Sequence, residues 1–106
     1  MTFDQARFTA DMAALGKANP GLTRSFQGVH ATALEDGVLP AATKELMALA
    51  VSVATGCEDC CGHHLDRARG LGSTDEEIAE TLGVAVLMGG GPALTHAARV
   101  AATFAG

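Results

Sequence analysis

The sequence has no tryptophan and no tyrosine, and four phenylalanines are the only residues of the Phe, Trp and Tyr class among 106 residues. Without large rings, a core must be filled by small and branched aliphatic side chains, and alanine dominates the sequence. Alanine is the strongest helix former, so the composition favours closely packed helices. Because hydrophobic residues make up 48% of so short a chain, we expect part of its surface to be covered in an oligomer.

Basic charge is also scarce, with 7 lysines and arginines against 12 aspartates and glutamates and a net charge of −5. No basic stripe is visible, which argues against a nucleic-acid partner. Residues 1–16 have neither the basic start nor the continuous apolar run of a signal peptide. The longest strongly apolar stretch, residues 46–54, is too short to cross a bilayer. We therefore expect a cytoplasmic protein without a membrane partner.

The 3 cysteines lie within five positions, as Cys57, Cys60 and Cys61. Cysteines so close together cannot staple distant parts of a fold, so a structural disulfide framework is not expected. In a reducing cytoplasm, neighbouring cysteines are typical of catalysis or of a metal site.

Every segment of the chain has helical character, and no strand-like alternation, internal repeat or linker is visible. We predict an all-α fold, in which residues 1–106 form a single-domain helical bundle of about six helices. The helix from Pro40 to about Thr55 is apolar nearly all round and should be the most buried. The predicted breaks fall at residues 19–21, 35–37, 56, 70–72 and 89–92.

The chemistry concentrates on the predicted fourth helix, with Cys57 and Cys60 at its N-terminus. At about 100° per residue, Cys57, Cys60 and His64 share one face. The two thiols lie one turn apart, so they could form a disulfide, and His64 lies where it could accept a thiol proton. The helix N-terminus stabilises a thiolate, which is the form that attacks peroxides and disulfides.

Two interpretations are open for Glu45, which lies 12 residues before Cys57 on the most apolar helix. It is either an exposed first-turn acid that interacts with the helix dipole or a carboxylate placed for proton transfer. A zinc site is a further alternative, with Cys57, Cys60 and His64 as three ligands. The fourth ligand would be Cys61, His63, Glu45 or His96, but the second, distant ligand pair usual in structural zinc sites is absent.

Ordinary structural roles are the simplest interpretation of the remaining candidates. We expect Cys61 to behave as a small buried hydrophobe. His63 falls toward the polar side of its helix and should be solvated, while His30 and His96 have no local partner and should be structural or surface residues. Glycines 89–91 lack the Lys-Ser/Thr of a phosphate-binding loop, so they indicate a helix break.

Several segments together resemble a known family. Residues 39–51, LPAATKELMALAV, run into Cys57-x-x-Cys60-x-x-x-His64, followed by a helix start at residues 74–80 and by GGGPA at residues 89–93. Over roughly residues 20–105, this pattern resembles the carboxymuconolactone decarboxylase superfamily, and within it the alkylhydroperoxidase D-like branch. The branch rests on Cys57 and Cys60, since decarboxylase members lack the cysteine pair.

The resemblance implies an all-helical fold that assembles as a homotrimer or homohexamer, and a thiol-dependent peroxidase or dithiol–disulfide oxidoreductase. In that chemistry Cys60 attacks the peroxide to give a sulfenic acid, Cys57 resolves it as a disulfide, and Glu45 with His64 relays protons. A dithiol donor, such as a lipoyl domain or a thioredoxin-like protein, supplies electrons, and no metal or other cofactor is required. Characterised peroxidase members carry His immediately before the second cysteine, where this chain has Asp59. The alternative is a non-catalytic oligomeric module of the same fold that acts as a redox switch or binds zinc.

Overall fold

Short-range sequence signals set the helix boundaries in the computed structural model, which describes residues 3–105. Asp4 and Asn19 cap the first two helices with side-chain oxygens that accept backbone N–H groups. Thr74 and Glu77 form the capping box of the last helix. The five helices are α1 (Gln5–Ala18), α2 (Pro20–Leu34), α3 (Ala41–Thr55), α4 (Glu58–Gly70) and α5 (Asp75–Ala101), and residues 3–105 contain no strand. The all-α prediction is confirmed.

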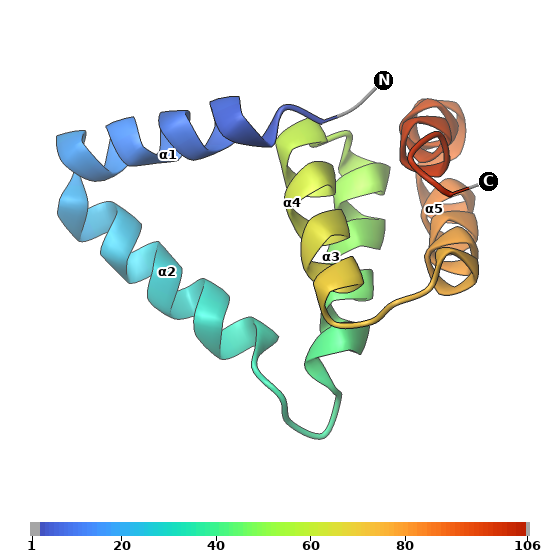
Figure 1. Ribbon diagram of the computed structural model, residues 1–106, viewed down its shortest axis with the longest axis horizontal. Helices are drawn as coiled ribbons and strands as arrows, with labels where there is room; N and C mark the ends of the chain where they lie inside the picture. The colour runs from blue at the N-terminus through green and yellow to red at the C-terminus, as the bar shows by residue number, and fades with distance from the viewer. Residues whose placement is uncertain (1–2, 106) are drawn as a thin grey trace.

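The helix count differs from the predicted six because the last two predicted helices form the single element α5. Gly90 interrupts α5 with non-helical angles, φ 69° and ψ −150°, and the helix changes direction (Figure 1). Only glycine adopts such a positive φ at little cost, and Pro92 two residues later lacks a backbone donor. The glycine run is therefore a kink, as its composition indicated, but not the end of an element.

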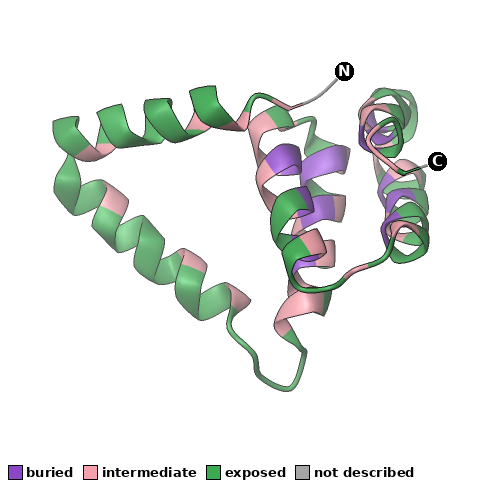
Figure 2. Ribbon diagram, viewed as in Figure 1, coloured by how far each residue is buried: buried purple, intermediate pink, exposed green. Residues whose placement is uncertain are grey.

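The core lies where α3, α4 and α5 meet, and α3 is central to it, as predicted (Figure 2). Its members are small and aliphatic, which follows from the shortage of aromatic residues. The largest fully buried apolar side chains are Leu49, Ile78, Val53 and Val100. One side of α3 remains uncovered, because Met47 and Val51 are 54% and 62% exposed.

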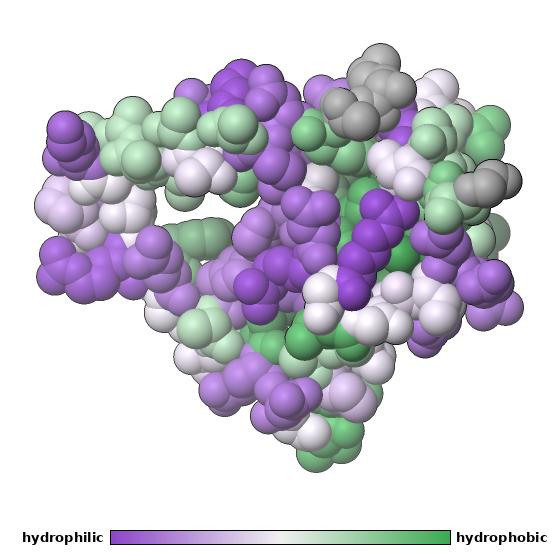
Figure 3. Space-filling model, viewed as in Figure 1, coloured by the Kyte–Doolittle hydropathy of each residue, from purple (hydrophilic) through white to green (hydrophobic). Residues whose placement is uncertain are grey.

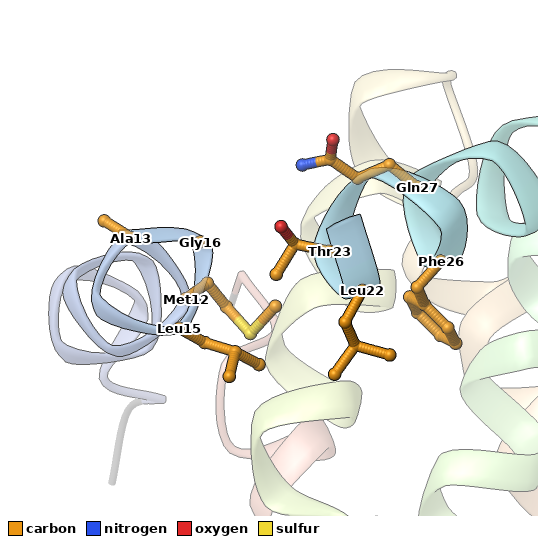
Figure 4. A pocket seen from close by; sticks show the side chains of 8 residues that line it. All are labelled: Met12, Ala13, Leu15, Gly16, Leu22, Thr23, Phe26 and Gln27. Carbon is orange, nitrogen blue, oxygen red and sulfur yellow. The ribbon is translucent and has the colours of Figure 1, made fainter. Parts of the chain in front are cut away.

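Helices α1 and α2 form a hairpin that reaches away from this core (Figure 1). Neither helix contains a buried residue, and the space-filling view shows an opening between the hairpin and the rest of the molecule (Figure 3). Between the two helices lies a cavity of about 530 Å³, lined mainly by apolar side chains that include Met12, Leu15, Leu22 and Phe26 (Figure 4).

By length and composition, α5 could cross a membrane, and it is the one such helix in the described part of the chain. Some of its apolar side chains pack within the bundle, where Ile78, Leu82 and Val100 belong to the core, whereas others on the same helix, such as Leu87 and Met88, are exposed. The kink at Gly90 divides α5, and residues on both sides of it, such as Ile78 and Val100, belong to the core.

Candidate redox site

The cysteine pair stands at the start of α4, as predicted. Cys57 is the N-cap residue, and its sulfur accepts the backbone N–H of Cys60 at 3.3 Å. The two residues are joined as a disulfide with their Cα atoms 5.2 Å apart, within the usual range for such a bond. When the bond is reduced, the same N–H and the positive end of α4 favour the thiolate of Cys57 over its thiol.

Glu45 comes from α3 and is 0% exposed, so its interpretation as an exposed first-turn acid is wrong. Its Oε2 lies 2.7 Å from Nδ1 of His64, and its Oε1 accepts Nε–H of Arg67 at 2.8 Å. Burial alone would raise the pKa of Glu45, but the hydrogen bonds from Arg67 and His64 and their charges outweigh it and hold the pKa below its ordinary value. The carboxylate is therefore ionised at neutral pH.

The orientation of His64 follows from this partner. An ionised carboxylate can only accept hydrogen bonds, so Nδ1 of a neutral His64 carries the proton and Nε2 keeps a free lone pair. A buried anion that holds the imidazole in one tautomer is the arrangement used to prepare a histidine as a general base. The structure thus brings together Glu45 and His64, which lie 19 residues apart.

Arg67 was missed by the sequence analysis, although a signal was present. It lies three residues after His64, so the helical step places both side chains on neighbouring positions of α4. Its guanidinium supplies the positive charge that allows Glu45 to remain ionised inside the protein.

A second cavity, of about 340 Å³, opens beside Cys60. Helices α1 and α2 supply an apolar wall, and α4 supplies the reactive groups. The lining residues are Phe8, Met12, Phe26, Gln27, His30, Cys60, His63 and His64. A small molecule in this cavity would meet the sulfur and the imidazole together while its apolar part contacts the hairpin.

His63 and His30 are placed differently from their predictions. His63 is half-buried rather than solvated, and its Nε2 lies 3.2 Å from Nε2 of His30. Burial, followed by the charges of His64 and His30, lowers the pKa of His63 and favours its neutral form. His96, the fourth histidine, bonds the carbonyl of Pro92 in its own helix at 2.9 Å, in keeping with a structural role.

Asp59, the acid next to Cys60 in sequence, is paired with a cation. Its Oδ1 accepts Nη2–H of Arg7 on α1 at 2.6 Å. The pair is partly solvent-exposed, so its energetic contribution is small, but it offsets the negative charge that would otherwise disfavour a nearby thiolate.

Cys61 faces the core and is 0% exposed, as expected of a small hydrophobe. Burial raises the pKa of this thiol to about 11. It therefore stays protonated and unreactive at neutral pH, and it is not available as a zinc ligand beside the cysteine pair without leaving the core.

Mild oxidation of the reduced protein is expected to remove two hydrogens and to link Cys57 to Cys60. At a pH well below 11, an alkylating reagent should modify two thiols of the reduced, folded protein, and Cys61 only after denaturation, because its thiol is buried and protonated. Intact-mass measurement and peptide mapping read out both results. A Cys60–Cys61 link, or early labelling of Cys61, would contradict the assignment.

A family model provides an independent comparison for this site. The model described as "Carboxymuconolactone decarboxylase family" matches residues 20–103. That range contains α2 to α5, and therefore Glu45, both members of the cysteine pair and His64.

Bacterial proteins of similar length match most of the chain. An uncharacterized protein of Cupriavidus necator is 45% identical over 91 residues, which cover 86% of this chain and 80% of that protein. An uncharacterized protein of Paracoccus denitrificans, named for its place in the cox locus, is 38% identical over 88 residues, which cover 80% of this chain and 79% of that one.

Solved structures support the fold. A carboxymuconolactone decarboxylase family protein from Legionella pneumophila, crystallised in its apo form, has a TM-score of 0.89 and 41% identity, with 94% of this chain and 89% of that chain covered. A Thermotoga maritima protein has a TM-score of 0.81 and 33% identity, with 94% and 87% covered.

Proposed function

Since the chain belongs to the carboxymuconolactone decarboxylase family, we propose that it is a thiol-dependent peroxidase of the alkylhydroperoxidase-like branch, with dithiol–disulfide exchange as its second half-reaction. One observation carries the proposal: Cys60, which is disulfide-bonded to Cys57, shares a cavity with His64, whose ring is held by a buried, ionised carboxylate. The carboxymuconolactone decarboxylase name alone does not specify this chemistry, whereas a cysteine pair at disulfide distance supports it.

The proposed cycle begins when the Cys60 thiolate attacks the outer oxygen of a hydroperoxide. The O–O bond breaks, Cys60 becomes a sulfenic acid, and the alkoxide takes a proton to leave as an alcohol. The Cys57 thiolate then attacks the sulfenic sulfur, a disulfide forms, and hydroxide leaves as water after protonation. A dithiol donor returns two electrons and two protons, so one peroxide and one dithiol become an alcohol, a water and a disulfide.

Each protein group has one task in this cycle. His64 removes the proton of the Cys60 thiol at Nε2 and returns it to the alkoxide, which is general acid–base work. Glu45 holds the ring and stabilises the imidazolium, and Arg67 keeps Glu45 ionised. The backbone N–H of Cys60 favours Cys57 as a thiolate and so prepares it for the resolving step.

The cavity also supports a substrate class. Its apolar wall of Phe8, Met12 and Phe26 suits the hydrocarbon part of an organic hydroperoxide. A lipoyl domain or a thioredoxin-like protein is the proposed electron donor, because either carries an accessible dithiol. A reducing cytoplasm, the predicted location, would keep such a donor reduced.

Steady-state turnover of an alkyl hydroperoxide is the test of this function. We expect peroxide consumption that requires a dithiol donor, in a panel that contains dihydrolipoyl domain, thioredoxin and a monothiol. Disulfide exchange with a donor but without peroxide consumption would reduce the function to that of an oxidoreductase. Absence of both reactions in folded, reduced protein would contradict the proposal.

We further propose that the protein acts as a homotrimer or homohexamer. Helices gain most of their stability from packing an apolar face, yet the α1–α2 hairpin has no buried residue. Exposed apolar side chains also gather on other helices, as expected of a surface covered by copies of the chain. The most exposed on the helices are Leu87, Met88, Val29 and Val51.

Light scattering on the purified protein is expected to report three or six chains. Leu87→Glu should shift the assembly toward smaller species, because Leu87 is 80% exposed in one chain and a carboxylate in an apolar interface is costly. Val38→Glu, at a fully exposed loop position, adds the same charge outside the helices and serves as the control. A stable monomer of the unmodified chain at micromolar concentration would contradict the proposal.

A further inference from the structure

Three histidines converge at the cavity beside Cys60. His30 lies near the end of α2, and His63 and His64 are neighbours on α4. One ring nitrogen from each lies within 4.8 Å of the others, and Nε2 of His30 is 3.2 Å from Nε2 of His63. We propose that this histidine cluster binds one divalent transition-metal ion of the zinc class, at a place distinct from the cysteine pair.

The spacing of the nitrogens fits such an ion. Tetrahedral zinc with Zn–N bonds of about 2.0–2.1 Å separates its ligand nitrogens by about 3.3–3.4 Å. The His30–His63 separation of 3.2 Å is already close to that value. The limit of 4.8 Å on the other separations means that the third nitrogen must approach by at most about 1.4 Å, which side-chain rotation supplies.

A second observation concerns the partner of His64. Metal-binding histidines generally donate their other ring N–H to a carboxylate, a backbone carbonyl or a water, which fixes the ring and raises its basicity. Glu45 holds Nδ1 of His64 at 2.7 Å, so Nε2 remains for the ion. Glu45 is itself fixed by Arg67, which completes an ordered outer shell.

Access to the cluster also suits a labile ion. The three rings are half-buried and line the cavity of about 340 Å³, which leaves room for water as a fourth ligand. Three protein ligands with one open position characterise exchangeable or catalytic sites rather than closed structural ones. Neutral imidazole favours zinc, copper, nickel and cobalt over calcium or magnesium.

The oxidised protein separates this site from a zinc–thiolate site at the cysteine pair. With Cys57 and Cys60 joined, neither sulfur is available as a thiolate, and Cys61 is buried in the core. Metal binding by the disulfide form must therefore come from nitrogen and oxygen ligands.

Calorimetric titration of the oxidised protein with Zn²⁺, after removal of adventitious metal, is the decisive experiment. We expect one ion per chain, at least tenfold weaker binding in His30→Gln and in His63→Gln, and unchanged binding in His96→Gln. Glu45→Gln should weaken binding roughly 10- to 100-fold through loss of the outer-shell carboxylate. The proposal would be overturned if no saturable binding occurred at millimolar zinc, or if the His30 and His63 variants bound zinc as tightly as the unmodified protein.

Imidazole nitrogen NMR of the unmodified protein gives a result that does not depend on the folding of a variant. Zinc should shift the ring resonances of three of the four histidines and leave those of His96 in place. A shift confined to the His96 ring, or no shift of any ring, would overturn the assignment. Tetrahedral Co²⁺ absorption without a thiolate charge-transfer band would confirm nitrogen and water ligands.

A consequence of this site rests on the proposed function. A bound ion would occupy Nε2 of His64 and the cavity beside Cys60, so stoichiometric zinc should suppress peroxide turnover and a chelator should restore it. The two ideas fail separately. Zinc binding without peroxide turnover in metal-free protein would support the metal site and contradict the peroxidase function. Peroxide turnover without zinc binding would support the function and contradict the metal site.

Discussion

Cys60→Ser is expected to abolish peroxide turnover, with a loss of at least roughly a thousandfold, as when a catalytic nucleophile is removed. Serine retains the shape of the side chain but not a sulfur that can become a sulfenic acid. Cys57→Ser should also stop multiple turnover, because the resolving thiol is gone. It should nevertheless react once and retain a sulfenic acid on Cys60, detected by mass after capture with a sulfenic-acid reagent.

Each of the two sulfurs has a structural feature that favours it as the attacking group, so the comparison of these two variants is informative. Cys60 lines the cavity together with His64, which favours it for contact with substrate. Cys57 receives the backbone N–H of Cys60, which favours its thiolate, as in thioredoxin-like motifs. Sulfenic acid on Cys57 in the Cys60→Ser variant would reverse the assigned roles.

Cys61→Ser is a matched control for both variants. It replaces the third sulfur of the same helix, but that thiol is buried, with a pKa raised to about 11. Turnover should remain, although a buried hydroxyl without a good partner lowers stability by about 1–3 kcal/mol. A large loss of turnover in this variant while it stays folded would mean that Cys61 takes part in the exchange.

The parts of this architecture that could be predicted from the sequence depend on short-range geometry. Helix boundaries follow from caps such as Asn19 and Thr74, which act within one turn. Cys57, Cys60 and His64 share one helix, so the helical step alone fixes their common face. Arg67 lies on the same helix and could have been found by the same reasoning.

The remaining site residues depend on tertiary packing, for which no local signal exists. His30 and His63 meet across 33 residues only because the hairpin returns α2 to α4. For Glu45 the sequence left two environments open, since an acid early in an apolar helix suits either solvent or a buried partner. The neighbouring α4, with His64 and Arg67, decides between them.

Glu45 and His64 are expected to act on the thiol as one unit. Glu45→Gln removes the buried negative charge that holds the His64 ring and stabilises its imidazolium, while almost preserving side-chain volume. His64→Gln removes the base itself. Each change should slow thiol reactivity and turnover by about ten- to ten-thousand-fold, a span that includes the roughly hundred- to ten-thousand-fold contribution typical of general acid–base catalysis.

Because Glu45 acts on the thiol through His64, the two losses should not add. The double variant should be little slower than the slower single variant, since without the imidazole the carboxylate has nothing to orient. Glu80→Gln, at an exposed carboxylate of α5, and His96→Gln are the matched controls and should leave the rates unchanged.

The pH dependence separates this role from a structural one. The pKa of Glu45 lies below its ordinary value, so its carboxylate remains charged through the neutral range and the Gln variant differs there by one full charge. A relay predicts a change in both the rate and the pH profile of Cys60 alkylation and of peroxide turnover. If folded Glu45→Gln keeps the rate and the profile of the unmodified protein, Glu45 serves only as a buried anchor for Arg67, and the relay must be abandoned.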